Sequence, residues 1–597
     1  MSRVPETVSF DQVNNDAAIA GPPQGGVFLL VQGLLAGAAV VLAGMLAAYF
    51  ENIEAYSFSV WQLAPWLLLI WLVSSLGLFG LAWLLTRVVA SARYWFLPGL
   101  TVLLWLQGPY NLPDYGPMDG APVDWSAFNF YYLRELVFVA GVAVFFWLLR
   151  HRVRHHVLTI LAGVLVVQTG AAGIAVWQAD RMPHARSPAA EVFRLSESHN
   201  VFLIILDAFQ ADVFKEIITR RPEYREALEG FVFWPDSVGL HPTTYVTIPA
   251  LFFGEPYRNE QPYREFSRRV YSSDSVLADF RDAGYQVDLF PRAAMPPIWV
   301  PTEASPNIVH GRHFATTWRA ALSEALVLFE FALFRHGPQL LRRVLYREGA
   351  WSLSPLPFHE YPEHYQHRTD IMMLAQLRRR AFVEGDQPVF RFIHVFTPHL
   401  PVVLDAEMQP RRRAFNRESF VDQAEAALKM LLGLLETLER EGVYDNSRIM
   451  VVADHGRSGI GLRRDLLGLV SDMPSSTELE ERMALASPLF LTKDFNATGR
   501  LRMSHAPVHL QDVARSLADV TGAAGRFPGY SVFSETPPAG RPRYFYDYRW
   551  QDHGWGADYL VPITEYRIQG HAWMPDAWSG PLRRFGRDGA VDVLGGE

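Results

Sequence analysis

The chain has 597 residues and a net charge of −8, and 50% of its residues are hydrophobic while 19% are charged. This length exceeds one ordinary domain, so at least two parts are expected. The composition favours a membrane part followed by a soluble part. The acidic balance excludes a basic surface for nucleic acid. The absence of cysteine excludes disulfides and thiolate metal ligands.

Five apolar runs lie near the N-terminus, and roughly 20 apolar residues span a bilayer as a helix. The runs cover residues 27–50, 61–85, 94–110, 132–149 and 157–177. A cleavable signal peptide is not expected, because the first run lacks a basic leader and four more runs follow it. The pattern predicts a cytoplasmic tail over residues 1–24, a five-helix transmembrane domain over residues 25–180, and a linker over residues 181–197.

The charges between the runs indicate the orientation of the chain. The loop after the second run carries Arg87 and Arg93, and the loop after the fourth carries Arg150, Arg152 and Arg154. The loops after the first and third runs carry only acidic charges. Because basic loops stay in the cytoplasm, everything after the fifth run is predicted to be extracytoplasmic. In a bacterium this is a multi-pass inner-membrane protein with a periplasmic or outer-surface domain. The alternative, buried helices of a soluble protein, conflicts with the sign of all four loops.

From His199 onward, short β-rich runs alternate with helical stretches. This alternation predicts an α/β domain with a largely parallel central sheet. Three continuous apolar runs, residues 201–206, 389–396 and 448–453, are typical of strands buried on both faces. Ligands of open α/β sheets bind at the carboxyl ends of the strands.

Residues capable of binding a metal follow all three of these strands. Asp207 follows the first, His399 lies three residues after the second, and Asp454 and His455 follow the third. Each residue alone has an ordinary explanation, since an Asp after a strand is often a helix N-cap and a lone His is often packed. Their joint occurrence predicts a divalent-metal site. Carboxylate and imidazole ligands suit Zn²⁺ or Mn²⁺.

The segment LHPTTYVTIPAL places Thr243 and Thr244 after Pro242, at a predicted helix start. A hydroxyl there meets backbone N–H groups and the positive end of the helix dipole, which suits an attacked phosphate. Coordination to a metal favours the alkoxide, which makes threonine a usable nucleophile. The alternative is that either threonine only caps the helix.

Four segments together resemble the successive site motifs of the alkaline phosphatase and sulfatase superfamily: NVFLIILDAFQAD, HPTTYVTIPALFFG, FIHVFTPHLP and RIMVVADHG. The resemblance covers residues 198–540 and implies an alkaline-phosphatase-like catalytic domain, with residues 541–597 as a C-terminal extension. With its membrane anchor, the chain resembles lipoteichoic acid synthases and lipid A phosphoethanolamine transferases. Those enzymes take a headgroup such as phosphoglycerol or phosphoethanolamine from a phospholipid donor. They hold it on a threonine and pass it to a glycan or lipid acceptor.

The resemblance implies a role for each candidate residue. The implied metal ligands are Asp207, Thr244, Asp454 and His455, and His505 lies where some superfamily members place a further ligand. Thr244 also matches the nucleophile, because it lies five residues before Pro249 as in the family pattern, and Thr243 is the alternative register. His399 matches a histidine that contacts the transferred phosphate or assists the leaving group.

The chain departs from the family pattern in several places. The Cys or Ser that sulfatases convert to formylglycine is missing, which disfavours sulfate-ester hydrolysis, and the disulfides of phosphoethanolamine transferases are impossible. Arg457 follows the DHG triplet where many relatives have an acidic residue, which argues against a second metal. Asp207 stands where the two transferase families usually have Glu.

Three functions follow from these matches and departures. The multi-span anchor favours a headgroup transferase, whereas Asp207 favours a phosphodiesterase or phosphatase-type hydrolase. A catalytically silent lipid sensor or binding protein is disfavoured because all four core site positions are present.

Three further segments have simpler interpretations. Residues 318–351 are predicted to be helical, either as a helix on the membrane surface or as an ordinary packed helix. Residues 415–442 read as an amphipathic helix, and residues 542–597 are predicted to add a strand or two.

Overall fold

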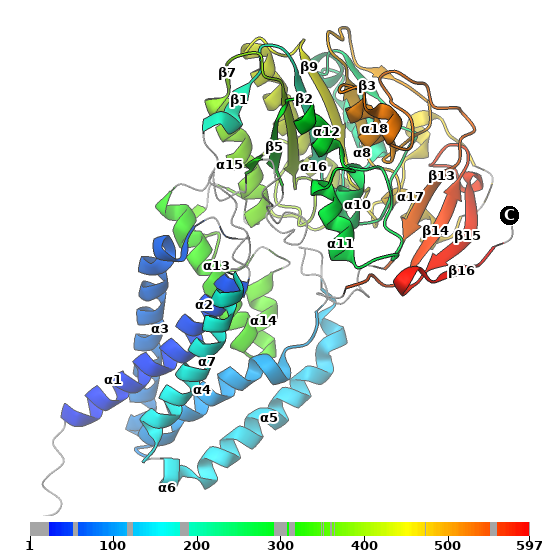
Figure 1. The fold of residues 1–597 in the computed structure, drawn as a ribbon. Helices are drawn as coiled ribbons and strands as arrows, with labels where there is room; N and C mark the ends of the chain where they lie inside the picture. The colour runs from blue at the N-terminus through cyan, green and yellow to red at the C-terminus, as the bar shows by residue number, and fades with distance from the viewer. Residues whose placement is uncertain are drawn as a thin grey trace, which may run out of the picture.

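The computed structural model describes most of the chain, as a helical bundle joined to an α/β domain (Figure 1). The described residues are 23–51, 56, 58–115, 123–153, 155–179, 190–291, 307–309, 317–347, 349, 351–358, 361–362, 364–471, 473, 475–549 and 558–595. Most of the predicted cytoplasmic tail and of the predicted linker lies outside them, as does Arg154 of the fourth loop.

The bundle has a helix at each of the five predicted apolar runs. The helices are α1 (Pro23–Gly37), continued through a π-helical turn (Ala38–Leu42) into α2 (Ala43–Glu51), then α3 (Val60–Val88), α4 (Ala92–Asn111), α5 (Asn129–Leu148), the short α6 (Arg150–Val153) and α7 (Val157–Ala179). Within the described residues, three segments are long and apolar enough to cross a membrane: Gly25–Glu51, Val60–Val88 and Trp125–Leu148. The count of five spans therefore stays a prediction.

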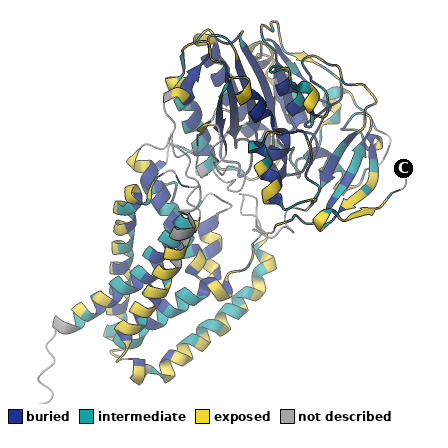
Figure 2. Cartoon of the chain, in the orientation of Figure 1, coloured by how far each residue is buried: buried dark blue, intermediate teal, exposed yellow. Residues whose placement is uncertain are grey.

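Small residues bring α1 against α3. A Cβ added to Gly33 would lie 2.8 Å from the Ser75 carbonyl oxygen, and one added to Gly37 would overlap Ser75 Oγ. Close approach through small residues is typical of helices that pack in a membrane, where lipid is as apolar as leucine. Many residues of the bundle helices are exposed (Figure 2), and they include apolar side chains such as Leu136 of α5.

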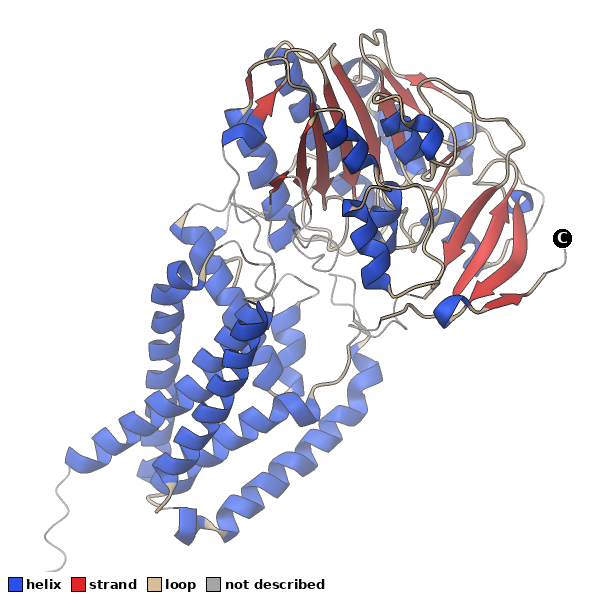
Figure 3. Ribbon diagram, in the orientation of Figure 1, coloured by secondary structure: helices blue, strands red, loops and turns tan. Residues whose placement is uncertain are grey.

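The α/β domain is built on one mixed sheet, which has eight strands within the described residues (Figure 3). In spatial order they are β11 (Arg502–Met503), β3 (Phe231–Phe233), β10 (Phe490–Lys493), β9 (Ser447–Val452), β2 (Asn200–Leu206), β8 (Val389–Val395), β5 (Gln286–Phe290) and β6 (Asn307–Ile308). The run from β9 to β6 is parallel, and β10 is antiparallel to both of its neighbours. The predicted, largely parallel sheet is confirmed, and β2, β8 and β9 match the predicted strands to within one residue.

Both faces of the central strands are buried under helices. Val201, Leu203 and Ile205 of β2 join a core with α10 (Thr244–Leu251), α12 (Val276–Asp282) and α18 (Asp512–Ala518). The intervening residues of β2 point into the opposite core, with α8 (Ala211–Arg220), α15 (Tyr365–Arg380) and α16 (Arg417–Arg440). Helix α16 is the predicted amphipathic helix. The remaining helices of this domain include α9 (Tyr224–Ala227), α11 (Tyr263–Arg268) and α17 (Thr477–Leu485).

The C-terminal segment forms an antiparallel sheet of its own. Its strands are β13 (Arg543–Asp547), β14 (Ile563–Ile568), β15 (Trp578–Phe585) and β16 (Val591–Val593). The prediction of a strand or two was too low, because most of β15 is solvent-accessible and β16 is an exposed edge strand, so neither has a continuous apolar run. Two short parallel pairs complete the strands: β1 (Arg194–Leu195) with β7 (Phe382–Val383), and β4 (Ser237–Val238) with β12 (Val508–His509).

Helix α13 (Trp318–His336) of the α/β domain packs into the helical bundle. Its alanine-rich face shares a buried apolar cluster with α2 and α3. His336 Nδ1 donates to the Leu104 carbonyl at 3.1 Å, and Arg335 pairs with Glu51 at 3.0 Å. The following helix, α14 (Gln339–Tyr346), is tied to the bundle by Arg342, which donates to the Asn111 carbonyl at 2.8 Å. Helix α13 is therefore a packed helix, and the membrane-surface role of this region stays a prediction.

Candidate active site

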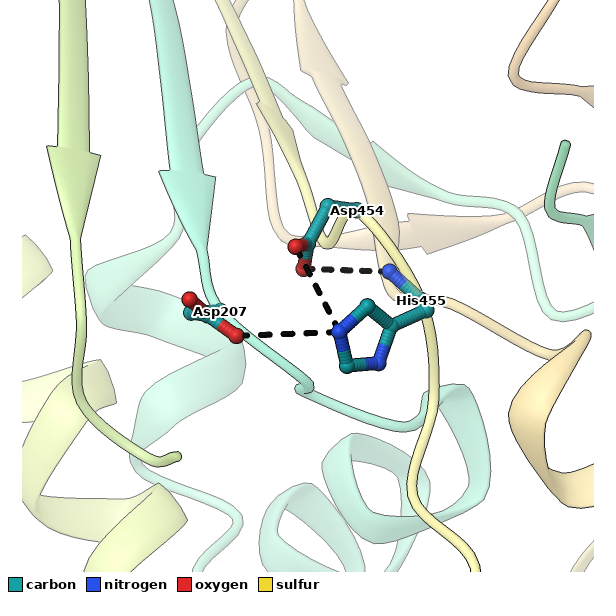
Figure 4. A group of neighbouring side chains, drawn as sticks. All are labelled: Asp207, Asp454 and His455. Carbon is teal, nitrogen blue, oxygen red and sulfur yellow. Dashed lines mark hydrogen bonds and ion pairs between the residues drawn. The ribbon is translucent and has the colours of Figure 1, made fainter. Parts of the chain in front are cut away.

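Three metal-capable side chains meet at the carboxyl edge of the central sheet. Asp207 directly follows β2, and Asp454 and His455 lie just after β9, the neighbouring parallel strand. One ligand atom from each of the three lies within 4.8 Å of the others (Figure 4). All three residues are buried. The structure thus brings together the three side chains that sequence reasoning proposed as metal ligands.

The hydrogen bonds of the group orient it toward a shared point. His455 Nδ1 donates to the Gly456 carbonyl at 2.7 Å, so Nε2 carries the lone pair of the neutral ring. That nitrogen lies 3.5 Å from Asp454 Oδ2 and 3.9 Å from Asp207 Oδ1. The other oxygen of Asp454 accepts the N–H groups of Ala208 and His455 at 3.1 and 3.0 Å.

This donor set fits a divalent cation. Asp454 Oδ2 is buried and accepts no hydrogen bond within the described part of the chain. Two carboxylates and an imidazole lone pair facing one another in a buried site repel unless a positive charge lies between them. A metal-bound histidine usually donates its second ring N–H to a carbonyl or carboxylate, as His455 does. Asp207, Asp454 and His455 could therefore hold a metal such as zinc or manganese.

The backbone around this group is tightly constrained. A Cβ added to Gly456 would overlap the carbonyl oxygen of Ala484, so the third residue of the DHG triplet can only be glycine. Ala208 adopts a left-handed conformation, with φ of 60°. Such conformations cost of order 1–3 kcal/mol and are found at functional sites. Here the conformation accompanies the bond from the Ala208 N–H to Asp454 Oδ1.

The two adjacent threonines point to different partners. Thr244 is the first residue of α10, and its Oγ1 lies 3.5 Å from Asp207 Oδ2 and 3.4 Å from His455 Nε2. Thr243 is the N-cap residue, and its hydroxyl instead shares a hydrogen bond with the hydroxyl of Tyr548. Of the two registers left open by the sequence, Thr244 is the threonine that faces the metal-capable group.

His394 is a site residue that the sequence analysis does not identify. It lies within β8, is fully buried, and its Nε2 is 3.2 Å from Asp207 Oδ2. Because a carboxylate only accepts, the ring donates this bond and orients the Asp207 side chain. A single histidine in the apolar run FRFIHVF is the sequence signal, but its partner lies 187 positions away in the chain.

The two remaining candidate histidines lie outside the three-residue group. His399 follows β8 in a buried loop, and its Nδ1 donates to the Leu400 carbonyl at 2.9 Å. His505 lies on the exposed segment after β11, at the far end of the sheet. Within the described residues, neither joins the group formed by Asp207, Asp454 and His455.

The mixed sheet, its helical layers and the buried site at its carboxyl edge define an α/β enzyme domain of the alkaline-phosphatase-like class. The sulfatase family model matches residues 199–523, more than half of the chain. The chain therefore belongs to the sulfatase family, within the alkaline-phosphatase-like superfamily, as the sequence resemblance predicted. Enzymes of this superfamily use divalent metals.

Several solved structures are distantly similar. One is Ps i-CgsB in complex with k-i-k-neocarrahexaose, with 13% identity over 65% of this chain and 83% of that one, and a TM-score of 0.40. The phosphonate monoester hydrolase SpPMH from Silicibacter pomeroyi has 14% identity over 63% and 87% of the two chains, with a TM-score of 0.38. The corresponding enzyme of Agrobacterium radiobacter has 13% identity over 66% and 89%, with a TM-score of 0.35. These similarities are too distant to carry an argument about activity. No curated protein sequence matches the chain.

Proposed function

We propose that this protein is a membrane-anchored, metal-dependent phosphotransferase of the bacterial inner membrane. It moves a phospho-headgroup from a phospholipid, through a Thr244-linked intermediate, to a glycan or lipid acceptor outside the cytoplasm. One observation carries the proposal: Thr244 Oγ1 lies within 3.5 Å of both Asp207 and His455. The apolar helices that could span a membrane support a donor taken from the bilayer.

The chemistry divides among few side chains. A bound divalent cation, zinc or manganese, would supply the positive charge that favours the threonine alkoxide and neutralises the phosphate. The bond from Thr244 Oγ1 to phosphorus forms as the bond from phosphorus to the diacylglycerol oxygen breaks. Asp207 Oδ2 takes the hydroxyl proton, and His399 Nε2 gives a proton to the departing oxygen. In the second step an acceptor hydroxyl attacks phosphorus, its proton goes to His399, and the bond to Thr244 breaks as Oγ1 recovers its proton from Asp207.

The second candidate is a phosphodiesterase or phosphatase-type hydrolase with the same first step. It differs only in the second step, where water rather than an acceptor hydroxyl attacks the threonine ester. Asp207 favours this alternative, because the hydrolases of the superfamily usually have Asp at this position. A silent lipid-binding relative is the third alternative, and the arrangement of Thr244 against Asp207 and His455 argues against it.

Mass spectrometry of the full-length protein tests the nucleophile. The protein is incubated with zinc or manganese and vesicles of phosphatidylethanolamine and phosphatidylglycerol. We expect a phospho-headgroup adduct on Thr244 and release of diacylglycerol. In Thr244→Ala both should fall to background while the metal content is retained. Thr243→Ala is the matched control and should keep the adduct, because its hydroxyl bonds to Tyr548. Undiminished diacylglycerol release by Thr244→Ala would exclude this nucleophile.

The same assay separates the two candidate functions. A transferase without acceptor should stop after a single turnover and hold the adduct. A hydrolase should release free phospho-headgroup into water continuously.

A further inference from the structure

The loop after β8 is fixed from both ends by buried polar side chains. The loop runs from Phe396 to Leu404 and carries His399 at its centre. Three side chains from two covering helices, Asp370 and His367 of α15 and Gln423 of α16, bond to its backbone. Asp370 is 4% exposed, and His367 and Gln423 are fully buried.

Asp370 holds the start of the loop. Its Oδ1 accepts the N–H of Phe396 at 3.1 Å, and its Oδ2 accepts both the N–H and the hydroxyl of Thr397 at 2.8 Å. One carboxylate thus satisfies three donors in two successive residues. Hydrogen bonds to a charged acceptor are shorter and stronger than neutral ones, so the chain leaves β8 in one defined direction.

Gln423 and His367 hold the centre of the loop at the backbone of His399. Gln423 Nε2 donates to the carbonyls of Pro398, His399 and Pro401 at 2.9, 2.9 and 3.1 Å. Its Oε1 accepts the N–H groups of Val403 and Leu404 at 2.7 and 3.1 Å. His367 Nε2 adds a second donor to the His399 carbonyl at 3.0 Å.

We propose that Asp370, His367 and Gln423 are positioning residues, which act on the reaction by fixing the loop that presents the His399 ring. The His399 carbonyl accepts from His367 and Gln423, and the ring donates through Nδ1 to the Leu400 carbonyl, so the backbone and the ring of His399 are both held. The bonds from Asp370, His367 and Gln423 to the loop all go to its backbone, apart from the bond with the Thr397 hydroxyl. These side chains from two helices therefore fix the path of the loop backbone. This inference rests on the proposed function, because it assigns His399 the role of proton donor.

A double-mutant cycle with a leaving-group series tests this role. The substrates are p-nitrophenyl methyl phosphate and phenyl methyl phosphate, whose phenolates differ in basicity. Attack by Thr244 breaks the bond from phosphorus to the aryl oxygen, and the more basic phenolate depends more on the proton from His399. We expect Asp370→Asn to lower the single-turnover rate of phenol release from the phenyl ester about 10²-fold, with a smaller loss for the p-nitrophenyl ester. His399→Ala should show the same pattern.

The decisive measurement is the double variant. If Asp370 acts through His399, then Asp370→Asn should cost no more than about twofold in the His399→Ala background. An undiminished loss there, or equal losses for the two esters, would overturn the inference. Gln423→Glu is the second variant, since it removes the amide donor with little change in shape. Its matched control is Glu425→Gln, the reverse exchange two residues along α16, where the carboxylate bonds to Tyr224 instead.

The failures of the two proposals are distinguishable. Full turnover of both esters by Thr244→Ala would defeat the proposed function itself. If Thr244→Ala loses activity, but the effects of Asp370→Asn and His399→Ala are additive in the double variant, only the positioning role would be defeated.

Discussion

The strand ends at the carboxyl edge of the sheet differ in how their polar atoms are satisfied. After β2 and β9, two carboxylates and an imidazole lone pair face one another, and Asp454 Oδ2 accepts no hydrogen bond within the described residues. After β8, the loop backbone is bonded to Asp370, His367 and Gln423. A bound cation would stabilise the first arrangement, whereas side chains of the protein hold the second. Substitutions at the two places should therefore fail differently, the first by losing metal and the second by losing catalytic geometry.

Removing a carboxylate from the first group should have the largest effect. We expect Asp454→Asn to lose bound metal and to lower the single-turnover rate of phenol release from an aryl phosphodiester by about 10³-fold. The estimate follows because a catalytic metal is worth several kcal/mol and each 1.36 kcal/mol is a factor of ten. Metal analysis of the purified full-length protein and initial rates measure the two effects. Asp445→Asn, before the opposite end of β9, is the control. Full metal content in Asp454→Asn would contradict the contrast drawn here.

Altering the support of Asp207 should have an intermediate effect. His394 donates to Asp207 Oδ2 from within β8. Losing such a supporting bond costs about 10- to 100-fold in metal affinity or activity. We expect His394→Leu to bind the metal about 10- to 100-fold more weakly. His394→Gln should retain more of the metal affinity, because its amide still offers an N–H to Asp207. Metal titration of both variants measures the difference. Equal affinities for the two variants would show that this hydrogen bond does not matter.

The smallest effect concerns stability and pH. His241, just before the two threonines, is buried, and burial together with Arg258 lowers its pKa to about 3. Its ring donates to the Tyr546 carbonyl and accepts the Tyr257 N–H as a neutral group. His241 is protonated near pH 6.5 in the unfolded chain but stays neutral at that pH in the folded protein. The contribution of the neutral ring to the free energy of unfolding is therefore fully present above pH 6.5. It is lost as the pH falls below it, by about 1.4 kcal/mol per pH unit.

Unfolding at pH 7.5 and 5.5 measures this pH dependence. His241→Gln should lose less stability than the unaltered protein between the two values, since it removes one titrating group. The same pH dependence in both proteins would mean that His241 is protonated in the fold.

Only those parts of the site that follow a local sequence pattern could be predicted from the sequence. β2, β8 and β9 are predictable because each is a continuous apolar run, and Asp207, Asp454 and His455 are predictable because each closely follows such a run. The choice of Thr244 over Thr243 depends on Tyr548, which lies 305 positions from Thr243. The bond from His394 to Asp207, and the bonds from Asp370 and Gln423 to the loop after β8, also join distant segments of the chain, so no local pattern reveals them. The edge strand β16 lacks a strand signal because it is exposed.

The packing of α13 has a practical consequence for producing the protein. In the chain, the predicted linker separates the apolar helical bundle from the α/β domain, which suggests a convenient place to truncate the protein. In space, Ala321, Ala325, Leu328 and Ala332 of the α/β domain are buried against α2 and α3. A fragment that begins after the linker would expose this face to water, so it should bind detergent or self-associate. Work on the catalytic domain therefore calls for the whole chain in a lipid environment.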